Sequence, residues 1–441
     1  MNPQKSNMAV LAQIVKLIPG KLIDTLAKKH KIQTRAFSPT SHVVTLLYAQ
    51  LSHALSLNDI CDGMHNHAGI LSQIRSCTPP TRNGLSYANR TRNAEMAEEL
   101  FWTVLHDLKE QYPDFFTGSR QYPGLPYRLH RAIYAFDSTT IRLTANSISW
   151  AQHRERKAAA KMHNGLNMQS FMPEYLIVKS AKDSDPKTAW ELCASLKAGE
   201  ICVFDRAYVD FKHLNHLHER GVFWVTRTKE NMRYEVMGQH AVSTQTADCD
   251  VTPKVMGQHR RGKLKKAPKR KYVRKKLRVI SDEKIRLTGN KTPVFYPREL
   301  RLITAEVEIK QEMTRISFIT NNFVWAASTI CELYRARWGI EVVFKELKQT
   351  LQLVDFMGYN ENAVRWQIWT AILGYVLLRF IAWSNRWKHT FGRLFTLIRS
   401  LLWNYFDLPS VIDCCDTTGR RGSMRIRGSP ESAYQMLFDL A

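Results

Sequence analysis

Residues 132–137 read Ala132-Ile-Tyr-Ala-Phe-Asp137, and residues 201–205 read Ile201-Cys-Val-Phe-Asp205. In each segment an uninterrupted apolar run comes directly before an aspartate. Such runs are typical of strands covered on both faces, and open α/β sheets build their sites at the C-terminal ends of such strands. The two segments therefore predict an α/β fold with Asp137 and Asp205 at its functional edge, although either aspartate alone could also cap a turn.

A third carboxylate lies on a predicted helix later in the chain. Between residues 334 and 348 the reactive side chains fall at offsets of 0, 3, 7, 11 and 14; they are Tyr334, Arg337, Glu341, Lys345 and Lys348. At about 100° per residue these offsets stay within a stripe about 80° wide on one helical face. An ordinary solvent-exposed helix, with Glu341 and Lys345 paired one turn apart, would show the same pattern.

The two aspartates that follow the predicted strands make a metal-binding role for Glu341 more plausible than an ordinary helical ion pair. Asp137, Asp205 and Glu341 together supply three carboxylate oxygen donors, which is the ligand chemistry that Mg²⁺ or Mn²⁺ prefers. We therefore interpret the three residues as one metal site.

The same segments resemble the insertion-sequence-four family of DDE transposases, which cut and paste mobile DNA with an RNase H-like catalytic core. Residues 334–348 match that family's Tyr-(2)-Arg-(3)-Glu-(6)-Lys signature at every fixed position. Phe136-Asp137-Ser138-Thr139-Thr140 is similar to the stretch around the family's first catalytic aspartate, and Val203-Phe204-Asp205-Arg206-Ala207-Tyr208 is similar to the second. The three segments stand in the family's order, so the resemblance covers about residues 130–350.

The resemblance implies that Asp137, Asp205 and Glu341 are the catalytic triad and hold the metal. Two ions, Mg²⁺ or Mn²⁺, would lie about 4 Å apart with Asp137 bridging them. Water would nick DNA at the element end, and the freed 3′ hydroxyl would attack a second phosphodiester and close a hairpin before insertion into the target. Neither Trp325 nor Trp338 is assigned the family's base-stacking role.

The cationic signature residues are expected to hold DNA backbone phosphates. Tyr334, Arg337, Lys345 and Lys348 would contact them, with Arg337 offering a planar two-pronged grip and the lysines point charges.

Two other functions remain compatible with the sequence. A metal-dependent nuclease or resolvase would cut DNA without joining it, and a non-catalytic DNA-binding repressor would tolerate loss of any carboxylate. Three intact carboxylates favour the transposase, because a binding-only protein gains little from convergent negative charges next to DNA.

Composition and charge agree with a large nucleic-acid enzyme. The chain has 441 residues, 44% of them hydrophobic, and a net charge of +25. This charge predicts a polyanionic partner and salt-sensitive binding, although ribosomal, RNA-binding and membrane-surface proteins share it. The partners implied by the resemblance are double-stranded DNA, as terminal inverted repeats and as target, and a second copy of the chain on paired ends.

The cysteines and apolar segments indicate a cytoplasmic protein, and the DNA partner that the resemblance implies would make it nucleoid-associated in a bacterium. The eight cysteines show no paired spacing and are expected to be reduced thiols. Polar residues interrupt the apolar stretch of residues 8–19, so no signal peptide is predicted. Residues 368–383 are apolar, but they are short for a membrane span and contain Arg379, so a buried helix is predicted.

The patterns divide the chain into five parts. They are a helical DNA-binding region (1–125), the first part of the RNase H-like core (126–228), a β-rich insertion domain (229–322), a catalytic helix completing the core (323–352) and a helical C-terminal region (353–441). Within the first part, residues 49–74 fit a helix-turn-helix that reads element ends, and they fit a plain helical packing unit equally well.

The core pattern predicts further elements around the aspartates. The expected strands are Leu166–Phe171, Tyr175–Lys179 and Val222–Thr226, and the expected helices are Pro186–Leu196 and Phe211–Arg220.

Basic residues in two places are candidates for further phosphate contacts. Lys157, Lys161 and His163 lie close to Asp137 in sequence, and a solvated surface is the alternative. Residues 259–278 hold twelve Lys or Arg and no acid, which fits either a clamp on DNA or a solvated linker. The residues singled out in this basic segment are Arg260, Arg261, Lys265, Lys266 and Arg270.

Overall fold

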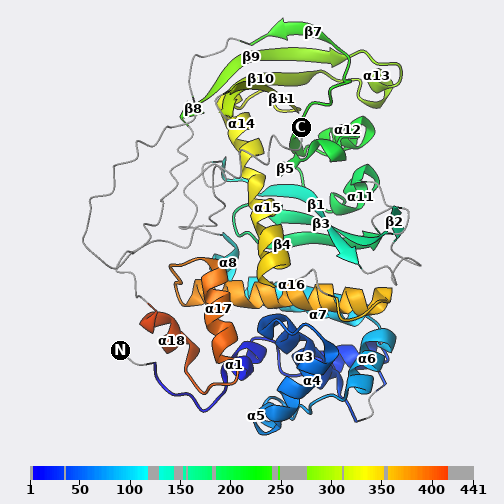
Figure 1. Ribbon diagram of the computed structural model, residues 1–441. Helices are drawn as coiled ribbons and strands as arrows, with labels where there is room; N and C mark the ends of the chain where they lie inside the picture. Colours follow the sequence, from blue (N-terminus) through cyan, green and yellow to red (C-terminus); the bar gives the residue numbers. More distant parts are fainter. Residues whose placement is uncertain are drawn as a thin grey trace.

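The computed structural model describes residues 3–33, 36–117, 129–143, 152–154, 157–180, 185–240, 247–248, 276–309, 312–351 and 356–415. The N-terminal and C-terminal helices pack together at one end of an elongated molecule, and a large twisted sheet extends from them to the other end (Figure 1). The chain is therefore a mixed α/β protein, as the apolar runs before the aspartates predict.

The N-terminal region is helical, as predicted. Its helices are α1 (Val10–Lys16), α2 (Leu22–Lys29), α3 (Pro39–Ser52), α4 (Leu57–Asn66), α5 (Ala68–Gln73), α6 (Arg82–Thr91), α7 (Glu95–Gln111) and α8 (Pro113–Thr117). Ser56 begins α4 with a capping box: its side chain accepts from the Asp59 amide, and the Asp59 carboxylate accepts from the Ser56 amide. The predicted helix-turn-helix at residues 49–74 corresponds to the end of α3 together with α4 and α5.

The sheet has eleven strands. They are β1 (Ile133–Leu143), β2 (Gln152–Arg154), β3 (Lys157–Asn167), β4 (Pro173–Ser180), β5 (Ile201–Phe204), β6 (Phe223–Arg227), β7 (Tyr234–Gln239), β8 (Ala247–Asp248), β9 (Lys276–Leu287), β10 (Leu300–Ile309) and β11 (Glu312–Thr320). The order is β2-β3-β1-β5-β6-β11-β10-β9-β7, with β4 also paired to β3 and β8 to β9. Strand β5 runs parallel to β1 and β6, and the other pairs are antiparallel.

Three predicted elements end elsewhere than expected. The strand predicted at Leu166–Phe171 is wrong, because β3 ends at Asn167 and a turn follows. The Phe171 amide donates to the Asn167 carbonyl at 2.8 Å, and Phe171 has a φ of 58°, so the chain reverses there into β4. The predicted helix Pro186–Leu196 is α11 (Asp185–Leu192), and that predicted at Phe211–Arg220 is α12 (Phe211–Glu219).

The strands of the predicted insertion continue the core sheet. Strand β11 pairs with β6 through residues 318–320 and 225–227, so β9, β10 and β11 extend the layer that carries the aspartates. A buried ion pair secures the junction: Arg301 Nε and Nη2 donate to the two Asp282 oxygens at 2.8 and 2.6 Å. Arg301 Nη1 also donates to the Asn322 and Trp325 carbonyls, just before the helices that follow.

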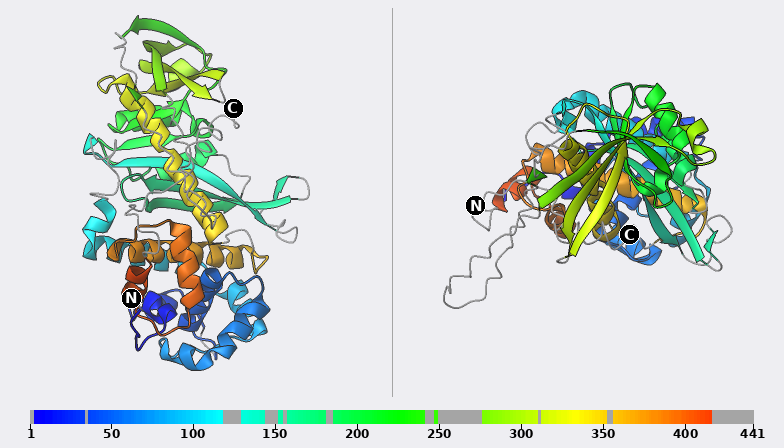
Figure 2. Two further views of the ribbon diagram at one scale, coloured as in Figure 1. Left: turned by 60° about the vertical axis from the view of Figure 1, so that its left-hand side comes forward. Right: turned by 90° about the horizontal axis from the view of Figure 1, so that it is seen from above.

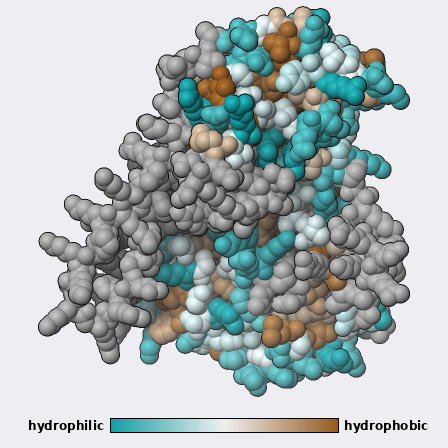
Figure 3. All heavy atoms as spheres, turned by 45° about the horizontal axis from the view of Figure 1, so that its top comes forward, coloured by the Kyte–Doolittle hydropathy of each residue, from teal (hydrophilic) through white to brown (hydrophobic). Residues whose placement is uncertain are grey.

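The outer end of this sheet exposes both polar and apolar side chains. Figure 3 shows apolar side chains scattered among polar ones at the end that the insertion strands form. The exposed apolar side chains on these strands are Tyr234, Val236, Met237, Ile280 and Met313. A short helix, α13 (Thr292–Phe295), lies at the same end.

The predicted signature helix is three consecutive helical segments. They are α14 (Ala327–Ala336), α15 (Trp338–Lys345) and a π-helical turn (Glu346–Thr350), with Arg337 at the α14–α15 junction. Together they lie diagonally across the sheet and lead down to the helical end (Figure 2). π-Helical turns often occur at functional sites, and this one carries Lys348.

The C-terminal region is helical, with α16 (Glu361–Ser384), α17 (Phe391–Leu401) and α18 (Leu408–Cys414). Helix α16 is long and apolar enough to cross a membrane, but 89% of its apolar window is buried inside the protein. It packs against α3, α6 and α7, which confirms the prediction of a buried core helix.

Candidate active site

The register of two parallel strands brings the aspartates together. The last paired residues of β1 and β5 are Phe136 and Phe204, so Asp137 and Asp205 follow at equivalent positions on neighbouring strands. After Phe204 the chain turns into a 3₁₀ turn at residues 206–208. Asp137, by contrast, lies in the middle of β1, because β1 continues to pair with β3 as far as Leu143. The prediction that Asp137 ends its strand is therefore wrong, although Asp137 directly follows the last residue of β1 that pairs with β5.

Glu341 reaches the same place from α15. Arg337 joins it to Asp137: Arg337 Nη1 donates to Asp137 Oδ2 at 2.5 Å, and Nη2 donates to Glu341 Oε1 at 3.1 Å. The side chains of Arg337, Asp137 and Glu341 are 8%, 14% and 26% exposed. The predicted triad residues Asp137 and Glu341 are thus joined through one guanidinium, with Asp205 on the adjacent strand.

The electrostatics of the site centre on Asp137. Burial raises the pKa of Asp137 to about 7; the Arg337 charge opposes this shift, and the Glu341 and Asp205 charges reinforce it. Burial would lower the pKa of Arg337, but the nearby carboxylates, led by Asp137, outweigh it and the pKa is raised. The site is therefore a partly buried anionic cluster with one cation bound in it.

The donor set suits a hard divalent cation. Carboxylate oxygens are the ligands that Mg²⁺ and Mn²⁺ prefer, and the Asp205 carboxylate has no hydrogen-bond or ion-pair partner within the described residues. In the described ranges no three Asp, Glu, His or Cys side chains lie close enough together to hold a metal ion. The Arg337 guanidinium, which contacts Asp137 and Glu341, provides the positive charge that balances these carboxylates.

The signature residues that were expected to bind phosphates differ in their surroundings. Tyr334 is buried against Phe318, with ring centroids 5.0 Å apart, and burial raises its pKa to about 12. Lys345 is exposed, and Lys348 Nζ donates to the Thr140 carbonyl at 2.8 Å. Of the four expected phosphate contacts, Lys345 is the one that the structure fully exposes.

The basic residues near Asp137 lie in a buried network. Lys161 Nζ lies 2.5 Å from Asp185 Oδ1, and His163 is completely buried with its Nδ1 2.9 Å from the Tyr208 hydroxyl. The Ser138 hydroxyl donates to the same Asp185 oxygen at 3.3 Å. This placement does not support a phosphate contact for His163.

Asp185 is a residue that the sequence patterns did not single out. It begins α11, where an aspartate ordinarily satisfies the helix N-terminus, so nothing local indicates that it meets Lys161 and His163. The side chain of Lys157 lies outside the described residues. So do Arg260, Arg261, Lys265, Lys266 and Arg270 of the predicted basic clamp.

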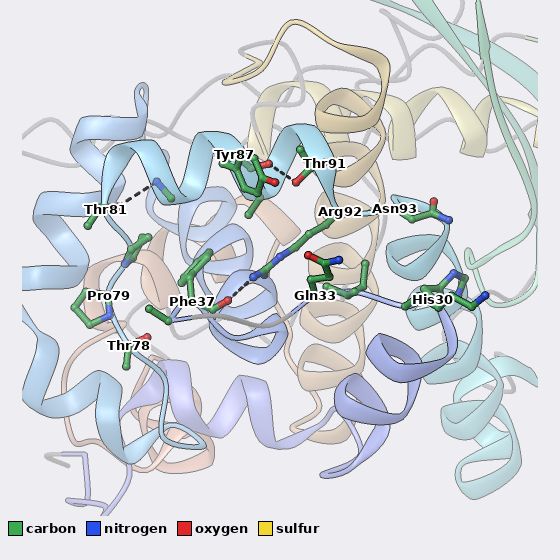
Figure 4. A pocket seen from close by; sticks show the side chains of 16 residues that line it. His30, Gln33, Phe37, Thr78, Pro79, Thr81, Tyr87, Thr91, Arg92 and Asn93 are labelled. Carbon is green, nitrogen blue, oxygen red and sulfur yellow. Dashed lines mark hydrogen bonds between the residues drawn. The ribbon is translucent and has the colours of Figure 1, made fainter.

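Helix α6 exposes a polar, cationic face in the N-terminal region. Its exposed side chains in the first two and a half turns are Arg82, Asn83, Ser86, Tyr87 and Arg90. The helix contains no acidic residue, and its two arginines form no ion pair within the described part of the chain. Beside this face lies a cavity of about 700 Å³ between α6 and the segment joining α2 to α3 (Figure 4).

These features define an enzyme of the DDE class, which acts on DNA. Residues 128–377, more than half of the chain, match the family described as Transposase DDE domain, and the chain belongs to this family. The match includes all three carboxylates. Residues 6–74 match a second family, described as Domain of unknown function (DUF4372), which covers α1 to α5.

Individual transposases are similar to this chain over 58% to 62% of its length. A putative transposase, y4zB, of Sinorhizobium fredii is 28% identical over 275 residues, which are 62% of this chain and 68% of that protein. A probable transposase for insertion sequence element IS5377 of Geobacillus stearothermophilus is 24% identical over 257 residues, 58% of each chain. The chain thus matches between 58% and 68% of the length of these two relatives.

Proposed function

We propose that the protein is the transposase of a bacterial insertion sequence of the insertion-sequence-four group, and that it moves the element by cutting and rejoining DNA. The observation that carries this proposal is that Arg337 joins Asp137 on β1 to Glu341 on α15, while Asp205 follows β5, the neighbouring strand. The transposase family match and the signature at residues 334–348 support it. The strand order β4-β3-β1-β5-β6 supports an RNase H-like core.

The residues of the site have different roles in phosphodiester cleavage and joining: the carboxylates bind metal ions, and the lysines bind the DNA backbone. Two Mg²⁺ or Mn²⁺ ions, when bound by Asp137, Asp205 and Glu341, supply Lewis acidity for the attacking and leaving oxygens. Asp137 must lose its proton to serve as a ligand, which its raised pKa delays until near-neutral pH. Lys345 at the end of α15 and Lys348 in the π-helical turn that follows hold the DNA backbone.

The reaction sequence rests on the resemblance to the family. Cleavage frees a 3′ hydroxyl at the element end, the hydroxyl attacks the opposite strand to close a hairpin, and the hairpin is reopened before joining to target DNA. Two protein copies hold the two paired ends, in the bacterial cytoplasm.

The exposed face of α6 is our candidate for reading the element ends. Arg82 and Arg90 offer fork-shaped donors for guanine edges or phosphates, and no acid on α6 opposes DNA. Helix α5, the last helix within the predicted helix-turn-helix, contains no basic residue. Arg82→Ala with Arg90→Ala should weaken end binding at least tenfold, whereas Lys388→Ala, at an exposed lysine after α16, should leave it unchanged. Equal affinities in a gel-shift titration would remove α6 from the interface.

The activity is tested with the DNA that flanks the gene. Purified protein is incubated with labelled element ends and Mg²⁺ or Mn²⁺, and the products are resolved on a denaturing gel. Nicks at the element boundary, hairpins and joined products should appear with wild type and vanish with Asp137→Ala and Glu341→Gln. Both variants should still bind the ends.

Other outcomes identify the alternatives. Metal-dependent nicks that never lead to joined products, even on paired ends, would identify a nuclease or resolvase. Binding without cleavage in either metal would identify a repressor. Activity in Glu341→Gln equal to that of wild type would refute the metal assignment.

A further inference from the structure

Arg337 is the cation that compensates the partly buried carboxylates Asp137 and Glu341. It sits at the α14–α15 junction and donates to Asp137 Oδ2 at 2.5 Å and to Glu341 Oε1 at 3.1 Å. Its side chain is 8% exposed. A buried carboxylate needs a partner to offset its lost hydration, and Arg337 provides one for two carboxylates at once.

A metal ion on Asp137 Oδ2 or on Glu341 Oε1 would compete with Arg337, which donates to both of these oxygens. The other oxygen of Asp137, Oδ1, already accepts from the Ser138 amide at 2.7 Å. A divalent cation on Oδ2 would lie next to the guanidinium, and the two positive charges would repel strongly in this partly buried site. Arg337 in its present position therefore competes with a metal ion for Asp137 Oδ2 and Glu341 Oε1.

Arg337 leaves the site short of positive charge. One guanidinium faces three carboxylates, and that of Asp205 has no partner within the described residues. Displacement of a singly charged guanidinium by divalent ions would therefore improve the charge balance. A guanidinium released from these carboxylates would be available to a DNA phosphate.

Arg337 also has unused binding capacity. Its Nε is buried and has no hydrogen-bond partner among the described residues, and its guanidinium lies 5.7 Å from the centre of the Tyr334 ring. A guanidinium fork matches the geometry of a phosphate as well as that of a carboxylate. Tyr334 would support the guanidinium in either position.

We propose that Arg337 is a resident counter-cation, which a divalent metal ion displaces from Asp137 and Glu341 and which then pairs with a DNA phosphate. The inference rests on the metal-dependent function proposed above. Arg337 would then bind DNA only after the metal ion has bound. In the metal-free protein Arg337 stabilises Asp137 and Glu341, and the site cannot cleave DNA.

The first test measures Mn²⁺ binding to the full-length protein without DNA, by isothermal titration calorimetry after EDTA treatment. Arg337→Gln should bind Mn²⁺ roughly tenfold more tightly than wild type, because the competing cation is gone. The control is Arg365→Gln, which removes a half-buried pair with Glu98 and should leave Mn²⁺ affinity unchanged. Unchanged or weaker Mn²⁺ binding by Arg337→Gln would overturn the proposal.

A further variant separates this proposal from the metal site itself. Wild-type Mn²⁺ binding that is lost in Asp137→Asn would establish the metal site independently of the Arg337→Gln result. Absence of Mn²⁺ binding in both wild type and Arg337→Gln would instead refute the metal site, and the displacement of Arg337 with it.

The second test is thermal unfolding in EDTA and in Mn²⁺. Arg337→Gln should melt at a lower temperature than wild type in EDTA, because Asp137 and Glu341 lose their shared cation. Adding Glu341→Gln to that variant should restore part of the loss, and Mn²⁺ should raise its melting temperature more than that of wild type. An Arg337→Gln protein as stable as wild type in EDTA, or a less stable double variant, contradicts the counter-cation role.

Discussion

Replacing Asp137 by asparagine should change how the stability of the metal-free protein depends on pH. The pKa of Asp137 rises from 3.8 to about 7 on folding, chiefly through burial. Between these values the unfolded chain releases the proton while the folded chain keeps it. Stability is therefore full below pH 3.8, falls by about 1.4 kcal/mol per pH unit above it, and levels off above about pH 7. The total loss is about 4 kcal/mol, of which about 3 kcal/mol falls between pH 5 and pH 8.

Asp137→Asn removes this dependence, because asparagine does not titrate. The side-chain amide oxygen can still accept from Arg337, so the variant keeps the contact and loses only the ionisation. The assay is urea unfolding followed by tryptophan fluorescence in EDTA at several pH values between 5 and 8. Relative to wild type, the variant should gain about 3 kcal/mol across this range.

Titrating groups remote from Asp137 are shared by the two proteins, so their contributions cancel in the difference. Parallel stability curves for wild type and Asp137→Asn would refute the raised pKa and the buried position of Asp137. A variant that loses stability relative to wild type as pH rises would show that folding lowers the pKa of Asp137 and does not raise it.

Two further predictions follow from the signature helix and from the sheet junction. Lys345→Ala with Lys348→Ala should weaken DNA binding and reduce the salt slope of log affinity by about 2, one for each lost phosphate contact; an unchanged slope in binding titrations over a range of salt concentrations would place neither lysine on DNA. Asp282→Asn should destabilise the protein by about 3 kcal/mol, because it leaves the buried Arg301 without its paired charge; a melting temperature equal to that of wild type would contradict this.

Local patterns were sufficient for the main elements of the core. The apolar runs before Asp137 and Asp205 predicted two buried strands, and the structure pairs them in parallel. The apolar stretch at residues 368–383 predicted a buried helix, which is part of α16. The strand expected at Leu166–Phe171 failed because its apolar residues lie on both sides of a turn, and composition does not distinguish a turn from a strand that buries the same side chains.

The sequence by itself specified the side chains of the proposed site: three carboxylates, two of them after apolar runs and one on a helix among cations. Only the tertiary structure decided which groups meet. Arg337 and Asp137 are 200 residues apart, so no local periodicity reveals that the arginine expected to hold phosphate binds the first aspartate. Nor does it reveal that His163 is buried, or that β11 joins the insertion strands to the core sheet. Residue type and spacing specify what a side chain can do, whereas its partner depends on how distant segments pack.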